Sequence, residues 1–142
     1  MKKIIYLSLL FILCNSSTCN KDKCHKTIAF VNNTSKDVYT YVCVRCYDTL
    51  EFYNQFPYPI LKEHMFKVKS GEKSIDGLWR RSCYEHYITQ EKGGTIVYVF
   101  DAEVLETVTW DTIEKYYMVL KTIRPTLEEM ERSNWTIYFT GE

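Results

Sequence analysis

The chain has 142 residues, of which 46% are hydrophobic, and its 18 basic and 18 acidic side chains give a formal net charge of zero. This composition is typical of a globular protein with a core of its own and excludes a disordered chain. No segment is a basic run, so the clustered positive charge that nucleic acid requires is missing and we expect no nucleic-acid partner.

The first eighteen residues have the order of an export signal. Lys2 and Lys3 are followed by an apolar run over 4–13 and then by small polar residues. The run is too short to span a bilayer, and this order is typical of a segment that is removed after export. We therefore predict a signal peptide over 1–18, a polar tether over 19–25 and a single domain over 26–142.

Cys19 is the predicted lipidation site. It follows three small residues, 16–18, which suit a signal peptidase, whereas Cys14 follows a bulky leucine. The pattern resembles a relaxed bacterial lipobox, with Ser16 in place of the usual leucine. Each buried acyl CH₂ contributes about 0.8 kcal/mol, so several chains would anchor the protein at the outer membrane or cell surface. The alternative is cleavage after Ser16 or Ser17 and a soluble secreted or periplasmic product.

Two strands are expected directly after the tether. Polarity alternates over 27–31 and again over 38–46, as it does in strands with one buried face. The residues between them, 32–37, are rich in Asn, Ser and Asp, which favour turns. We therefore predict that the two strands form a hairpin.

The middle of the chain holds a loop and further strands. The two prolines at 57 and 59 indicate a loop or a sheet edge over 47–63. Two extended pieces, 66–68 and 75–78, are joined by a turn at Gly71. The segment 95–101 is apolar on both faces, which predicts a central strand covered on both sides.

Two helix starts are expected in the last third. Asp111 and Glu114 have capping-box spacing, and apolar residues then recur at helical spacing as far as Leu120. Thr126 and Glu129 form a second capping box at the start of a short helix.

The chain closes on an alternating strand over 134–139. Six or seven short strands with few helices predict a mainly β protein. We expect a β-sandwich, immunoglobulin-like or similar, with one or two short helices inserted before the C-terminal strand.

Five stretches follow one another along the chain: IAFVNNTSKDVYTYV, YDTL, VKSGEKSIDGLW, TIVYVFDAEVLETVTWDTIEKYYMVLK and PTLEEMERSNWTIYF. In this order they resemble a family of small Bacteroides-type lipoproteins of unknown role. Relatives tend to have Tyr-Pro-Asp-Thr where this chain has Cys46-Tyr47-Asp48-Thr49. The resemblance implies the fold and an envelope location, and it brings no catalytic residues with it.

Four cysteines are disulfide candidates, because export favours oxidised thiols: Cys24, Cys43, Cys46 and Cys83. They allow three full connectivities. We favour Cys83 with Cys43 or Cys46, which would close a long loop.

A metal- or redox-active protein is the alternative. Cys43, Cys46, Cys83 and His86 have the C-x-x-C and C-x-x-H spacing of a zinc set. Residues three apart in a strand project from opposite faces, which opposes this set, so we expect no metal. A thioredoxin-like role for Cys43 and Cys46 would require a helix N-terminus rather than a strand.

No nucleophile elbow, zinc-protease helix or glycine-rich phosphate loop is present in the sequence, so we expect no enzyme activity and no cofactor. Aromatic residues make up 15% of the chain, with twelve tyrosines, and serve either strand packing or a binding face. Thr49, in Asp48-Thr49-Leu50, resembles the O-glycosylation sites of this bacterial group. The expected function is a non-enzymatic, lipid-anchored envelope module that binds a protein or a glycan.

Overall fold

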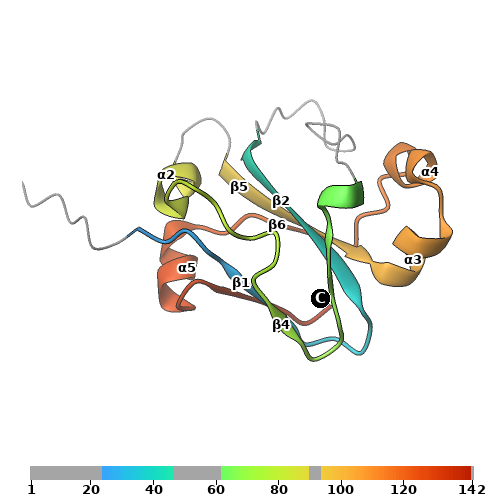
Figure 1. Cartoon of the computed structure of the whole chain (residues 1–142), viewed down its shortest axis with the longest axis horizontal. Helices are drawn as coiled ribbons and strands as arrows, with labels where there is room; N and C mark the ends of the chain where they lie inside the picture. The colour runs from blue at the N-terminus through green and yellow to red at the C-terminus, as the bar shows by residue number, and fades with distance from the viewer. Residues whose placement is uncertain (1–23, 47–61, 90–93, 142) are drawn as a thin grey trace, which may run out of the picture.

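The computed structural model describes residues 24–46, 62–89 and 94–141, and the fold in these ranges is dominated by a pair of β-sheets (Figure 1). One sheet has the order β4-β1-β7, with β1 (Ala29–Asn32), β4 (Lys73–Ser74) and β7 (Thr136–Phe139). The other has the order β3-β2-β5-β6, with β2 (Val38–Cys46), β3 (Phe66–Val68), β5 (Gly94–Asp101) and β6 (Lys121–Ile123). The expectation of a sheet-dominated protein is confirmed.

Short helices lie at the two ends of the molecule. In Figure 1, α2 (Tyr84–Ile88) and α5 (Leu127–Arg132) lie at one end, and α3 (Ala102–Thr107) and α4 (Trp110–Lys115) at the other. A 3₁₀ turn, η1 (Lys62–His64), precedes β3. These are more helices than the sequence predicts. None that the structure describes has the length and hydrophobicity needed to cross a bilayer.

The expected hairpin of β1 and β2 is wrong, because the two strands belong to different sheets. β1 pairs in parallel with β7 and antiparallel with β4, whereas β2 pairs with β3 and β5. Asn32, which is fully buried, explains the separation. Its Nδ2 donates to the carbonyl of Lys36 at 2.7 Å and to that of Val68 at 3.1 Å. The turn is therefore held to the end of β3, in the other sheet.

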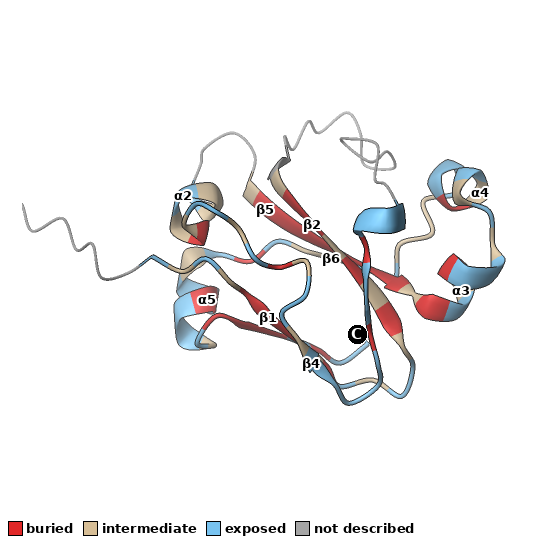
Figure 2. Ribbon diagram, viewed as in Figure 1, coloured by how far each residue is buried: buried red, intermediate tan, exposed pale blue. Residues whose placement is uncertain are grey.

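β5 is the central strand that the sequence predicts. Val97 and Val99 face a core cluster that includes Phe30 and Phe139 of the other sheet. The alternate residues face a second cluster together with Leu105 of α3 and Ile113 of α4; they are Ile96, Tyr98 and Phe100. Figure 2 shows β5 as buried along almost its whole length. Because strand side chains alternate between faces, one apolar strand supplies both cores.

The segment after Trp110 differs from its prediction. The helix ends at Lys115, and Tyr117 has a positive φ of 47°, which breaks helical geometry. The chain then pairs as β6 with β5, and the Leu120 N–H donates to the Val99 carbonyl at 2.9 Å. This pairing satisfies the backbone groups along the edge of β5, and it overrides the helical spacing of the sequence. The Asp111–Glu114 capping box is also wrong, because the N-cap is Thr109, whose side chain makes no capping bond.

The second capping box, at the start of α5, is confirmed. The Thr126 Oγ1 accepts the Glu129 N–H at 3.2 Å, and the Glu129 carboxylate accepts the Thr126 N–H at 2.8 Å. These reciprocal bonds satisfy two backbone donors that a helix start leaves without partners.

Thr126→Ala is expected to lower the free energy of unfolding by about 1 kcal/mol, because the N-cap oxygen is lost. Urea denaturation measures the change. Thr126→Ser keeps the oxygen and is the first control, and Thr140→Ala, at an exposed threonine after β7, is the second. A loss of the same size in the serine variant would show that the cap is not the cause.

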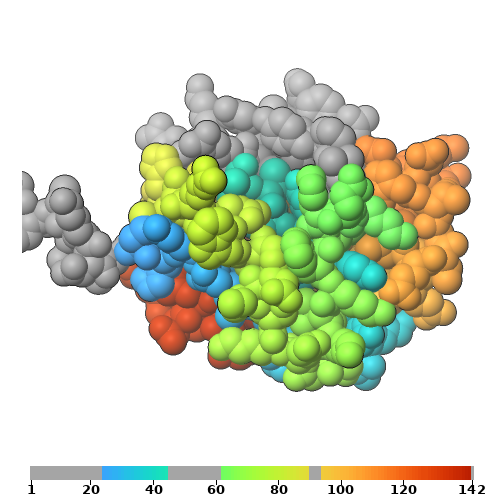
Figure 3. All heavy atoms as spheres, viewed as in Figure 1, coloured from blue at the N-terminus to red at the C-terminus, as the bar shows by residue number. Residues whose placement is uncertain are grey.

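Two helices, α3 and α2, have weak sequence signals or none. α3 follows β5 directly, and Asp101 caps it by accepting the N–H groups of Glu103 and Val104 at 2.9 and 3.4 Å. α2 has no side-chain cap and so no local signature. The segment 62–89, which contains α2, covers the middle of the face seen in Figure 3 (green to yellow-green).

Candidate functional site

Several predicted site residues lie outside the described residues. They are the lipidation site Cys19, the glycosylation candidate Thr49 and the side chain of Cys46. The other disulfide candidates, Cys24, Cys43 and Cys83, are described, and they do not form the favoured pairs.

Cys24 is bonded to Cys83, 59 positions away in the sequence, with the Cα atoms 4.9 Å apart. The favoured pairing of Cys83 with Cys43 or Cys46 is therefore wrong. Backbone pairing explains the choice: the Tyr84 N–H donates to the His25 carbonyl, and the Arg80 N–H donates to the Lys26 carbonyl, both at 2.8 Å. These bonds place residues 25–26 beside residues 80–84, and so bring Cys24 close to Cys83.

The zinc set is not assembled. Cys83 is oxidised in its bond to Cys24, and Cys43 is also disulfide-bonded. A sulfur in a disulfide is not a thiolate, and zinc binds thiolates. His86 is exposed on α2, where its ring lies 5.8 Å from that of Tyr87. Nowhere in the described ranges do three His, Cys, Asp or Glu side chains gather to hold a metal.

His25, next to the Cys24–Cys83 bond, is held by contacts with Trp135 and Glu85. Its ring stacks on the Trp135 ring, with centroids 4.1 Å apart and planes at 14°. Its Nδ1 lies 2.6 Å from the Glu85 carboxylate, which also accepts the His25 backbone N–H at 3.1 Å. These contacts hold His25, the last residue of the expected tether, against α2 and against Trp135, which directly precedes β7.

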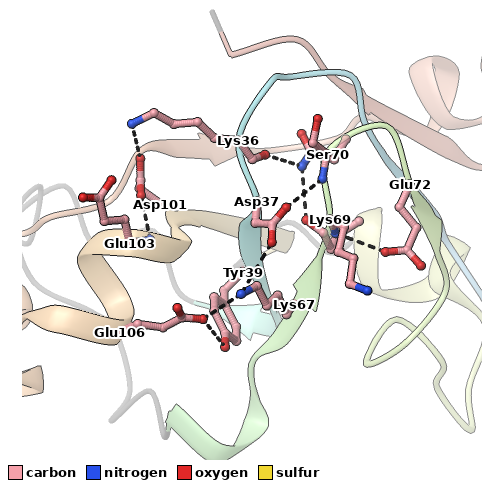
Figure 4. A network of polar contacts seen from close by, with 12 residues as sticks. Lys36, Asp37, Tyr39, Lys67, Lys69, Ser70, Glu72, Asp101, Glu103 and Glu106 are labelled. Atoms are coloured by element: carbon pink, nitrogen blue, oxygen red, sulfur yellow. Dashed lines mark hydrogen bonds and ion pairs between the residues drawn. The ribbon is translucent and has the colours of Figure 1, made fainter.

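Two hollows that the described residues form are candidates for ligand binding. The first, of about 300 Å³, is called the charged hollow and is shown in Figure 4. It lies where the start of α3 faces β2 and β3. Its lining consists of Lys36, Asp37, Lys67, Asp101, Ala102, Glu103, Glu106 and Thr107.

Most charged side chains of this hollow form ion pairs with one another. Lys36 lies 3.1 Å from the Asp101 carboxylate, and Lys67 lies 2.8 Å from Glu106 and 3.5 Å from Asp37. The Tyr39 hydroxyl donates to Glu106 at 3.1 Å. These contacts link α3 to β2 and β3, as the dashed lines of Figure 4 show.

The pKa values of the acids reflect these partners. The Ser70 N–H holds the pKa of Asp37 below its ordinary value, and hydrogen bonds from Lys67 and Tyr39 do the same for Glu106. Burial acts to raise the pKa of Asp101, but the Lys36 hydrogen bond and two backbone N–H groups outweigh it, so this pKa is also lowered. All three carboxylates are thus stabilised as anions without a ligand.

Stability is expected to fall in acid because of these three carboxylates. Their pKa values are lower in the folded state, so the unfolded state binds more protons, and the free energy of unfolding decreases as the pH drops below about 4.5. Lys67→Met removes a partner of two of them and is expected to make this decline shallower. Thermal unfolding between pH 7 and pH 3 measures it, and an equally steep decline in the variant would contradict the assignment.

The second hollow, of about 330 Å³, is called the aromatic hollow. It joins β2, η1, β3 and the loop after β4, and its lining consists of Tyr41, Val42, His64, Phe66, Gly77 and Arg80. Among the described residues that line it, the ionisable groups are a tyrosine, a histidine and an arginine, and none is an acid.

Phe66 lies directly over Gly77. A Cβ at Gly77 would be 2.0 Å from the Phe66 ring, and Gly77 has a φ of +69°, which disfavours other residues. The ring is therefore seated on a backbone surface that only glycine provides, and 37% of the Phe66 surface remains exposed. Ile75 and Trp79, nearby in the chain, are also exposed, at 56% and 58%. Ile75 was expected to lie within an extended piece over 75–78, but the strand here is β4, at 73–74.

Arg80 is held in place by backbone groups. It donates to the carbonyls of Gly77 at 2.9 Å and Trp79 at 2.8 Å through Nη1, and to that of Val42 at 3.0 Å through Nη2. No carboxylate in the described ranges of the chain forms an ion pair with it. A guanidinium has five N–H donors, so two donors remain for a ligand.

Sequence reasoning missed the aromatic hollow. Its residues come from four segments, with no motif spacing among them, and only pairing of β2 with β3 brings Tyr41 near Phe66. Comparison with protein-family models, with curated proteins and with solved structures finds no match for this chain.

Proposed function

We propose that this protein is an exported, non-enzymatic module of the cell envelope that binds a glycan in the aromatic hollow. The aromatic hollow carries this proposal. Its volume of about 330 Å³ lies in the range of small-ligand sites, and it combines aromatic surface with fixed polar donors. The apolar C–H face of a sugar ring packs on such rings, and the donors then orient its polar groups.

The charged hollow supports binding less well. Its lysines and three of its acids already have partners, so a ligand would have to break these contacts. In the aromatic hollow the Phe66 ring is partly exposed and Arg80 has donors to spare. A ligand there adds contacts without removing any that the structure shows.

A glycan suits the aromatic hollow better than a protein does. A stable protein interface buries about 800 Å² on each partner. The large apolar residues exposed near this hollow are only Phe66, Ile75 and Trp79 among those described, which is a small face. Protein binding is thus an alternative outcome of the test below.

The proposal of export rests on the signal pattern over 1–18 and on the cysteines. The Cys24–Cys83 bond is consistent with an oxidising compartment. We further propose acylation at Cys19, as the resemblance to Bacteroides-type lipoproteins implies. We also propose that the two sheets form a β-sandwich, because Phe30, Phe139, Val97 and Val99 pack in one cluster.

A glycan array probed with mature protein tests the binding proposal. We expect binding that Phe66→Ala weakens at least tenfold, while Tyr138→Ala, at an exposed aromatic residue on β7, leaves it unchanged. A negative array would overturn the glycan proposal. A pull-down in which the wild type captures a protein that Phe66→Ala does not capture would then favour the protein-binding alternative.

Intact mass of the membrane-extracted protein tests the envelope proposal. We expect the mass of a chain that begins at Cys19 and carries acyl groups, and the same measurement reports any glycan at Thr49. A soluble product that retains residues 1–18 would contradict both export and anchoring.

A further inference from the structure

We propose that the ligand of the aromatic hollow is an acidic saccharide, whose carboxylate is bound by Arg80. This inference rests on the glycan-binding function proposed above and specifies the class of sugar. It starts from the charge of the hollow. Arg80 carries a permanent positive charge, and no acid is found among the described residues that line the site.

The position of Arg80 is set before any ligand arrives. Three backbone carbonyls, from Gly77, Trp79 and Val42, accept its N–H groups at 2.8–3.0 Å. Because both Nη1 hydrogens and one Nη2 hydrogen are used, the remaining donors are on Nε and Nη2. These are neighbouring nitrogens of one planar group, and such a pair matches the two oxygens of a carboxylate. A preorganised guanidinium loses little entropy on binding.

The neighbouring residues complete the fit. Phe66 and Tyr41 supply the aromatic surface for the sugar ring, and His64 adds a polar group at the same hollow. The charged hollow shows the contrast: four acids line it, against two lysines, so it would repel an anion. An acidic sugar is therefore directed by charge to the aromatic hollow.

Calorimetric titration tests this with oligogalacturonate, its methyl ester and sialyllactose as probes. The ester keeps the sugar ring and removes the charge, so wild-type protein should bind the acid at least tenfold more tightly than the ester. Sialyllactose presents a carboxylate on a different ring, and it shows whether recognition extends beyond uronic acids.

Arg80→Gln should abolish the preference for acid over ester while the weak binding of the ester persists. Arg81→Gln removes the same charge from the exposed neighbouring residue and should leave the preference intact. If Arg80→Gln does not fold, the comparison of acid with ester on the wild type still decides the question.

Equal affinity for acid and ester in the wild type would overturn the acidic-saccharide inference and leave glycan binding standing. Failure of all glycans, neutral and acidic, on both titration and array would overturn the proposed function as well.

Discussion

Replacing both Cys24 and Cys83 by serine is expected to lower the free energy of unfolding by about 2–4 kcal/mol. The bond joins residues 59 positions apart, so its loss gives the unfolded chain many more conformations. The folded state also loses the restraint that holds the start of the described chain beside Tyr84 and Glu85, where His25 makes its contacts.

Urea denaturation of the wild type, of each single variant and of the double variant measures this effect. Either substitution removes the whole bond. The free energy of unfolding of the double variant should therefore lie within a few tenths of a kcal/mol of that of each single variant. The proposed role of the bond would be contradicted if the double variant lost the sum of the two single-variant losses in free energy of unfolding. A loss below about 1 kcal/mol in the double variant would also show that this bond does not stabilise the fold.

Gly77→Ala is expected to weaken ligand binding at the aromatic hollow at least tenfold and also to lower the free energy of unfolding. The new Cβ would be 2.0 Å from the Phe66 ring, so the ring must leave its position. The backbone strain of a left-handed φ adds a stability cost of about 1–2 kcal/mol.

Gly71→Ala is the matched control. Gly71 has a similar φ of +73°, but an added Cβ there would meet no heavy atom within 4 Å. The two variants therefore share the backbone strain and differ in the ring displacement. Titration of both with the ligand identified on the array separates the effects, and equal affinities would exclude a role for the Phe66 position in binding.

Local features of the fold could be predicted because their causes are local. The segment 95–101 is apolar at successive positions, which only a strand between two cores accommodates, and β5 is that strand. The Thr126–Glu129 box is formed by residues three apart, so spacing alone predicts it.

Pairing and partner choice could not be predicted in the same way. A turn-rich segment between two strands normally indicates a hairpin, but Asn32 bonds to Val68, more than thirty residues away, and the two strands separate. Likewise, apolar residues after Ile113 have helical spacing, but the free edge of β5 binds the segment as β6. In both cases a distant backbone group outcompetes the local preference.

The candidate site could likewise be predicted only in part: its residue types are visible in the sequence, but their proximity is not. The sequence contains the aromatic residues, the cysteines and the export pattern, and these suggested an exported binding module with Cys24 and Cys83 among its candidate disulfide residues. It contains no spacing that brings Phe66, Gly77 and Arg80 to Tyr41, nor any that joins Cys24 to Cys83.

The amino-acid sequence by itself determined where most strands form and how β5 presents its two faces, because side-chain alternation and caps depend on neighbours within a few residues. Only the tertiary structure decided which strands pair, which cysteines meet and where the aromatic hollow opens. The physical reason is that hydrogen-bond partners, disulfide geometry and hollows depend on residues far apart in the chain, whose proximity exists only once the two sheets have formed.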